Sequence, residues 1–194
     1  MHPSAPVPPK RTRLPLRLSA TAAILFATAC GTGADAQDKA AGALPFSFSE
    51  IATFNEPWAM AFLPDGRALI TEKSGKLKLW REGQPAADVT GVPAVSYAGQ
   101  GGLGDVVLHP GFATNGIVYL SWAEAEGDVK GAVVGRAKLV EDNAGARLEG
   151  LTVIWRQSPK VTGNGHFGHR MAFGPDGKLY ISSGERQKFD PAQD

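Results

Sequence analysis

The sequence contains almost no cysteine: Cys30 is the single one among 194 residues. An intrachain disulfide framework is therefore excluded. Charge of one sign is not in excess either, because 20 Lys and Arg residues face 19 Asp and Glu residues. That balance gives no basic footprint, so we expect no nucleic-acid partner. Helical periodicity is also lacking, because no window of about a dozen residues repeats its apolar positions every 3.6 residues.

Glycine and proline are abundant by contrast, with 24 and 14 residues. The hydrophobic share of 43% and the charged share of 20% are those of a globular protein. Many glycines and prolines favour turns between short strands over long helices. Beyond the N-terminal region, no segment is apolar enough to span a membrane.

Residues 1–36 have the pattern of an export signal. Basic residues precede an apolar stretch over 18–29, which is long enough for a signal peptide and too short to cross a bilayer. Ala34-Asp35-Ala36 is a cleavage motif of the A-x-A type. We therefore expect a signal peptide over 1–36, a mature domain over 37–194, and a periplasmic or secreted location.

A second way of processing the leader stays open. Ala27-Thr28-Ala29-Cys30 resembles a bacterial lipoprotein box, in which Cys30 would carry a lipid anchor. The residue three positions before the cysteine is usually Leu and is Ala27 here, which favours plain cleavage.

The rest of the chain contains a repeated motif. Residues 60–67, MAFLPDGR, return as 171–178, MAFGPDGK, with a looser copy, VVLHPGF, at 106–112. Pro, Asp and Gly in this order are typical of a tight turn between two strands. The strands predicted after the turns are 68–71, 117–122 and 179–182, and further strands are predicted at 76–81, 131–139 and 151–156.

Units of about four short antiparallel strands and ~40–50 residues are the size of β-propeller blades. A β-sandwich also has regularly spaced strands, but it does not explain why the same turn recurs at the same place in each unit. Residues 37–194 suffice for about three blades, whereas closed propellers have about four to eight. We therefore expect an all-β chain that supplies two and a half to three blades, as the N-terminal part of a larger propeller.

Two glycine-rich loops, 97–104 and 161–170, each precede the first strand of a unit. Corresponding places in a propeller face the same channel, so the two loops should lie at one end. The first loop carries Gln100 among glycines that allow a ligand to approach the backbone closely. The second loop carries His166, a candidate general base because imidazole titrates near neutral pH.

Other side chains near these loops allow several interpretations. Glu185 follows the next strand back to the same end, where it would orient His166, bind a sugar hydroxyl, or simply be an exposed charge. His166 and His169 are three residues apart, but a pair without a third ligand is weak evidence for a metal site. His109 lies in a proline turn, and we interpret it as structural.

Taken together, these segments resemble one family. The motifs PWAMAFLPDG at 57–66, GQGGLG at 99–104, HPGF at 109–112 and GHFGHR at 165–170 are similar to those of the soluble glucose/sorbosone dehydrogenases, most of all the aldose sugar dehydrogenase branch. These are periplasmic quinoproteins that use pyrroloquinoline quinone (PQQ) and Ca²⁺. The resemblance implies a six-bladed propeller with the quinone at the mouth of its channel.

The resemblance also implies roles for single residues. His166 would be the general base, and Gln100 would lie beside the quinone and the sugar. Glu185 stands where glucose-oxidising relatives have an Asp, and Gly165 stands where some relatives have an Asp before the base. These departures bear on sugar preference.

The implied reaction is PQQ-dependent oxidation of an aldose at its anomeric carbon to the lactone. The Ca²⁺ ligands and the basic residues that hold the quinone would lie beyond residue 194, with no metal ligand in this chain. The chain alone should then be inactive, and the electron acceptor is not identified. Two other functions stay open: a non-catalytic propeller that binds a partner, and a calcium-dependent propeller lactonase.

Overall fold

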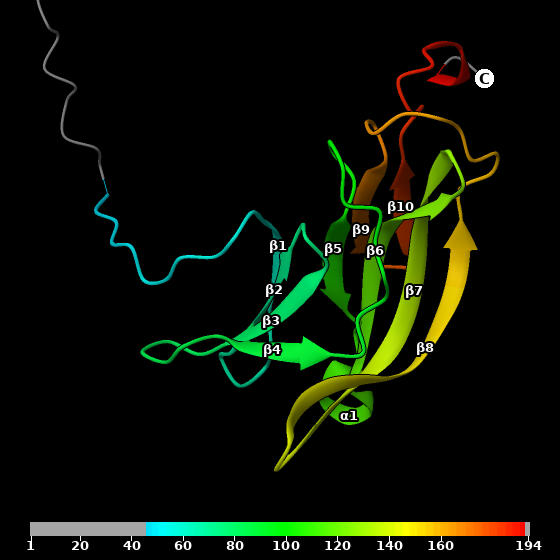
Figure 1. The fold of residues 1–194 in the computed structure, drawn as a ribbon. Helices are drawn as coiled ribbons and strands as arrows, with labels where there is room; N and C mark the ends of the chain where they lie inside the picture. The colour runs from blue at the N-terminus through cyan, green and yellow to red at the C-terminus, as the bar shows by residue number, and fades with distance from the viewer. Residues whose placement is uncertain (1–45, 193–194) are drawn as a thin grey trace, which may run out of the picture. The chain divides into compact units, whose positions relative to one another are not determined.

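Strands, nearly all paired antiparallel, account for almost all regular structure in the described part of the chain, residues 46–192 of a computed structural model (Figure 1). The first unit contains β1 (Pro57–Phe62), β2 (Ala68–Glu72), β3 (Lys76–Trp80) and β4 (Ala87–Thr90). The second contains β5 (Leu103–Leu108), β6 (Ile117–Glu126), β7 (Val129–Asp142) and β8 (Gly145–Arg156). A third unit begins with β9 (Gly168–Phe173) and β10 (Leu179–Ser183), and the helical pieces are α1 (Phe112–Asn115) and the 3₁₀ turn η1 (Asp190–Ala192).

This architecture confirms the all-β propeller prediction, with two four-stranded blades and the start of a third. The sequence underestimated the outer hairpin of the second blade, because β7 and β8 continue to a turn at residues 142–145. Residues 141–145 are exposed, so they carry no apolar pattern to reveal the strands. Strand β4 was not located by the sequence for a similar reason, since only Val89 of its four residues is buried.

One strand pairing was not expected. The outer strands of the two blades, β4 and β8, pair in parallel through Val89 with Ala146 and Thr90 with Arg147. The eight strands of both blades thereby form a single sheet in the order β1-β2-β3-β4-β8-β7-β6-β5, while β9 and β10 form a separate pair. The two blades are therefore continuous at this outer edge.

The hydrophobic core lies between the first two blades. Residues from both contribute, and Leu69, Leu77, Leu103, Leu120 and Val133 have no exposed surface. Removing this apolar surface from water is the main force that holds the blades face to face.

Two buried hydroxyl groups join neighbouring blades at equivalent places. The Thr71 hydroxyl on β2 donates to the Gly104 carbonyl at 2.6 Å and accepts the Ala59 N–H at 3.0 Å. The Ser121 hydroxyl on β6 donates to the His169 carbonyl at 2.8 Å and accepts the Asp105 N–H at 2.8 Å. Each hydroxyl thus links the first strand of its own blade to the first strand of the next.

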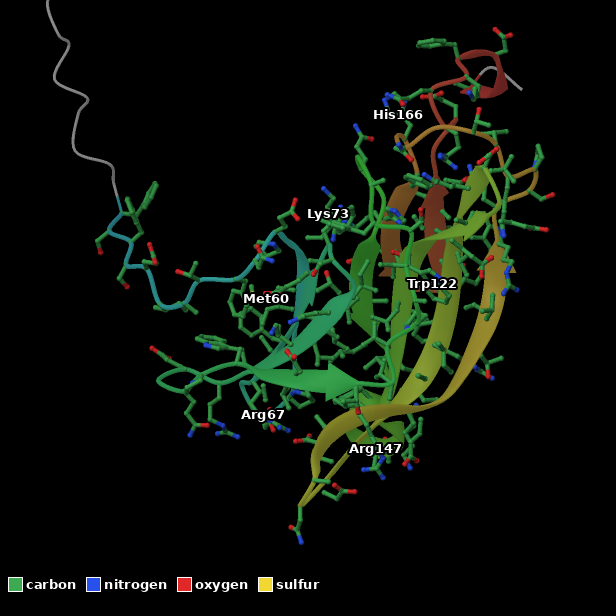
Figure 2. All side chains as sticks on the ribbon, viewed as in Figure 1. Met60, Arg67, Lys73, Trp122, Arg147 and His166 are labelled. Atoms are coloured by element: carbon green, nitrogen blue, oxygen red, sulfur yellow. The ribbon has the colours of Figure 1, made fainter. Side chains whose placement is uncertain are left out.

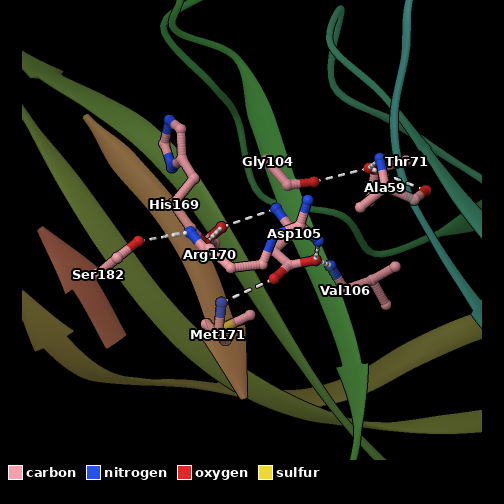
Figure 3. A network of polar contacts seen from close by, with 10 residues as sticks. Ala59, Thr71, Gly104, Asp105, Val106, His169, Arg170, Met171 and Ser182 are labelled. Atoms are coloured by element: carbon pink, nitrogen blue, oxygen red, sulfur yellow. Dashed lines mark hydrogen bonds and ion pairs between the residues drawn. The ribbon is translucent and has the colours of Figure 1, made fainter. Parts of the chain in front are cut away.

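A buried carboxylate strengthens the second junction (Figure 3). Asp105 on β5 accepts the Met171 N–H at 2.7 Å and the Arg170 Nη1–H at 3.0 Å, both from β9. Burial raises the pKa of Asp105, while these hydrogen bonds and the charge of Arg170 oppose that rise. The start of β9, and with it the loop that carries His166, is therefore held firmly against the second blade.

The predicted signal peptide over 1–36, its cleavage site and Cys30 lie outside the described residues. Within the described part of the chain, no helix has the length and apolar character needed to cross a membrane.

Candidate active site

The His166 loop connects β8 to β9 and turns sharply before β9 begins. Its backbone has positive φ at Gly163, at His166 (49°) and at Gly168. Such a conformation is uncommon for a residue with a side chain, and strained backbones gather at functional sites. Phe167 is buried beneath the loop, whereas the side chain of His166 is 44% exposed at the end of the molecule opposite Arg147 (Figure 2).

The two glycine-rich loops meet at this end, as the sequence predicted. The His166 backbone N–H donates to Oε1 of Gln100 at 2.8 Å. In the other direction, the Gln100 backbone N–H donates to the Asn164 carbonyl at 2.7 Å. Gln100 therefore holds the backbone of the candidate base through its side chain. The sequence reasoning did not single out Asn164, although its position between two glycines was the available signal.

The third predicted residue joins the same cluster. Glu185, just after β10, forms a hydrogen bond between Oε1 and Nδ1 of His166. Its other oxygen accepts the N–H of Lys188 at 2.7 Å and of Phe189 at 3.2 Å. The hydrogen bond with His166, followed by these two N–H groups, lowers the pKa of Glu185 below its usual value.

This arrangement determines what the imidazole can do. An ionised Glu185 accepts a hydrogen bond from Nδ1–H, so in the neutral imidazole of His166 the free lone pair lies on Nε2. Among the described residues, Nε2 has no hydrogen-bond partner. A base held by a carboxylate, with its second nitrogen open to the outside, can remove a proton from a bound hydroxyl.

The family model for glucose/sorbosone dehydrogenases matches residues 54–194. The chain belongs to the glucose/sorbosone dehydrogenase family. It is 41% identical over 143 residues to the aldose sugar dehydrogenase YliI of Escherichia coli K12, covering 72% of this chain and 38% of that protein.

Solved structures give the same result. A crystal structure of glucose dehydrogenase aligns with a TM-score of 0.70 and 41% identity, over 75% of this chain and 43% of the other. The PQQ-bound aldose sugar dehydrogenase of Streptomyces coelicolor aligns with a TM-score of 0.63 and 29% identity, over 73% and 42%. The chain thus spans less than half the length of the relatives that it matches.

The glycines of the family's GQGGLG segment have a different use here from the predicted one. A β-carbon on Gly102 would lie 2.0 Å from the Lys73 carbonyl oxygen, and one on Gly99 would lie 2.6 Å from that of Asn164. Both glycines also have positive φ. These two glycines therefore allow a close approach of neighbouring loops of the protein itself, and the loop presents Gln100 at the surface.

Gly165, the family departure just before the base, also has a structural explanation. A β-carbon there would lie 2.6 Å from the side-chain amide of Gln187. The flexible, exposed side chain of Gln187 thus occupies the space beside the candidate base in this chain.

Within residues 46–192, the two other histidines, His109 and His169, lie apart from this cluster. His169 is buried between Phe167, on which it stacks, and the edge of Trp58, so it does not share a site with the exposed His166. His109 accepts the Gly111 N–H at 2.9 Å through Nδ1 and closes its turn. Among residues 46–192, no three His, Cys, Asp or Glu side chains gather in a way that could hold a metal ion.

Proposed function

We propose that the protein to which these residues belong oxidises an aldose sugar at its anomeric carbon to the lactone, with hydride transfer to PQQ. Membership of the family supports sugar oxidation. The observation that carries the finer proposal is the pair formed by His166 and Glu185, with Nε2 left open.

In this proposal, His166 removes the proton of the anomeric hydroxyl through Nε2. Loss of that proton raises the electron density on oxygen, which favours departure of hydride from the same carbon. Glu185 keeps the ring in the correct tautomer and stabilises the imidazolium that forms. Gln100 takes no part in the proton transfer in this proposal. It positions the base, because its side-chain oxygen accepts the His166 N–H and holds that loop in place.

The residues present fit one edge of a quinone site. An exposed carboxamide and an exposed imidazole lie side by side at the open end of the blades, where a flat cofactor and a sugar can both reach the base. When bound, PQQ would accept the hydride, which carries both electrons of the oxidation. The proposal includes Ca²⁺, with ligands outside residues 46–192. It also places the protein in the periplasm or outside the cell, with Cys30 as the alternative lipid attachment site.

The test joins residues 46–194 to the part of the E. coli aldose sugar dehydrogenase that this chain does not match. With PQQ and Ca²⁺ added, we expect this chimera to reduce a dye when given an aldose, and to release the lactone. The 194-residue chain alone should give no turnover. In the chimera, His166→Gln should lower kcat by about 10²–10⁴-fold, the usual contribution of a general base.

Melting temperature and PQQ binding serve as controls, and both should be unchanged by His166→Gln. A folded, PQQ-binding chimera that oxidises no aldose would contradict the proposal. Sugar binding without oxidation would favour a binding module, and hydrolysis of added lactone without PQQ would favour a lactonase.

A further inference from the structure

Arg186 is a cation in an unusual place. It follows Glu185 directly, and only 2% of its surface is exposed. Among the described residues, no carboxylate lies within ion-pair distance of its guanidinium. A buried charge without a counter-ion is unfavourable unless other polar groups satisfy it.

Backbone carbonyls satisfy this guanidinium. Its Nε–H donates to the Gly165 carbonyl at 2.8 Å, and its Nη2–H donates to the Gly163 carbonyl at 2.7 Å. Its Nη1–H donates to the carbonyl of Lys130, at the start of β7. Its plane also lies over the ring of Phe167, 3.5 Å from the centroid.

These contacts surround the candidate base. Gly163 and Gly165 precede His166, Phe167 follows it, and the Arg186 backbone N–H donates to the His166 carbonyl at 3.2 Å. Arg186 itself has a φ of 60°, as does Gln187, so the segment after Glu185 keeps a strained turn. One short segment thus holds the imidazole through Glu185 and the loop beneath it through Arg186.

We propose that Arg186 is a positioning residue for the pair formed by His166 and Glu185. The inference rests on the proposed function, since it concerns the same base. The guanidinium binds three backbone carbonyls at once. It thereby fixes the position of the His166 loop, and so the placement of the imidazole relative to the Glu185 carboxylate. A lysine could not reproduce this, because its ammonium is a single point without the planar fork.

The test first uses the 194-residue chain and needs no activity. Arg186→Met, Arg186→Lys and the control Arg147→Met, at a partly exposed arginine far from the site, are compared by NMR. Arg186→Met should speed hydrogen exchange at the His166 amide by about tenfold or more, because at least one net hydrogen bond is lost. It should also abolish the downfield Nδ1–H signal of His166. Arg186→Lys should restore part of both, and Arg147→Met should change neither.

Activity in the chimera gives the second readout. Arg186→Met should lower kcat by about tenfold with little change in KM, since the base is misplaced while the sugar contacts remain. If the amide and Nδ1–H signals stay as in the parent while only the melting temperature falls, Arg186 merely supports the fold and the proposal is wrong. If Arg186→Met does not fold, unchanged signals in Arg186→Lys overturn it. A chimera that is inactive with Arg186 intact would count against the proposed function, and the NMR result would still decide the role of Arg186.

Discussion

At the scale of single residues, His169 shows how packing can bury a polar side chain without hydrogen-bond partners. It is 3% exposed, and both ring nitrogens lack hydrogen-bond partners. Burial, followed by the positive charge of Arg186, lowers the pKa of His169 to about 4. The ring is therefore neutral at pH 7 and serves as a flat filler between Phe167 and Trp58.

This burial predicts a loss of stability in acid. The unfolded chain binds a proton at His169 near pH ~6.5, whereas the folded chain does so only near pH 4, so the free energy of unfolding falls as the pH drops through that window. The expected loss from this residue is about 3 kcal/mol. Urea unfolding across this pH range measures it.

His169→Phe provides the comparison. It should remove this part of the pH dependence and keep or raise stability at neutral pH, because Phe buries no unpaired nitrogen. An unchanged slope in the variant would show that other groups cause the acid sensitivity.

A second residue-scale prediction concerns the glycine loop. Gly102→Ala should destabilise the protein by more than Gly127→Ala. Both glycines have positive φ, but a β-carbon at Gly127 has nothing within 4 Å, whereas one at Gly102 meets the Lys73 carbonyl. The control should lose about 1–2 kcal/mol, the usual penalty of a left-handed backbone. Thermal and urea unfolding report both, and equal losses would mean that the Lys73 turn yields freely.

At the scale of elements, the junction between blades depends on a few polar groups on second strands. Thr71 and Ser121 each bridge to the first strand of the following blade. The Ser182 hydroxyl on β10 likewise accepts the Arg170 N–H at 3.0 Å, so all three second strands bear a hydroxyl with the same local bond. The repeat in the sequence thus has a counterpart in polar contacts as well as in turns.

Thr71→Val tests this junction with almost no change in shape. The Gly104 carbonyl and the Ala59 N–H would each lose a buried partner, which should lower the free energy of unfolding by about 2 kcal/mol. Thr90→Val, at an exposed position of β4, is the matched control and should change little. Similar losses in both variants, measured by urea unfolding, would contradict the bridging role.

At the scale of the whole molecule, local signals in the sequence predicted the strands and turns better than they predicted which strands lie next to one another. The repeat at 60–67 and 171–178 revealed the blades because a Pro-Asp-Gly turn depends on residues adjacent in the chain. The parallel pairing of β4 with β8 left no such signal, since Val89 and Ala146 lie far apart in sequence. Pairing of that kind depends on how two finished blades pack.

The candidate site also combines residues that the sequence predicted with one that only the packing revealed. Loop positions predicted that Gln100, His166 and Glu185 lie at one end of the blades, because corresponding loops of a repeat face the same way, and the resemblance to the family suggested their roles. Nothing local distinguished Arg186 from an exposed arginine in a polar loop. Its guanidinium can be buried because three carbonyls, from β7 and from the loop before β9, accept its hydrogen bonds.

The sequence by itself therefore determined the all-β class, the blade repeat and the family, and it predicted three candidate residues for the site. Turn chemistry, strand alternation and motif spacing are properties of neighbouring residues, so they can be seen without coordinates. Only the tertiary structure decided which tautomer His166 adopts, that His169 is buried and neutral, and that the glycine loop packs against Lys73 and Asn164. Each of these depends on distances between segments separated by many residues, and those distances exist only once the blades have packed.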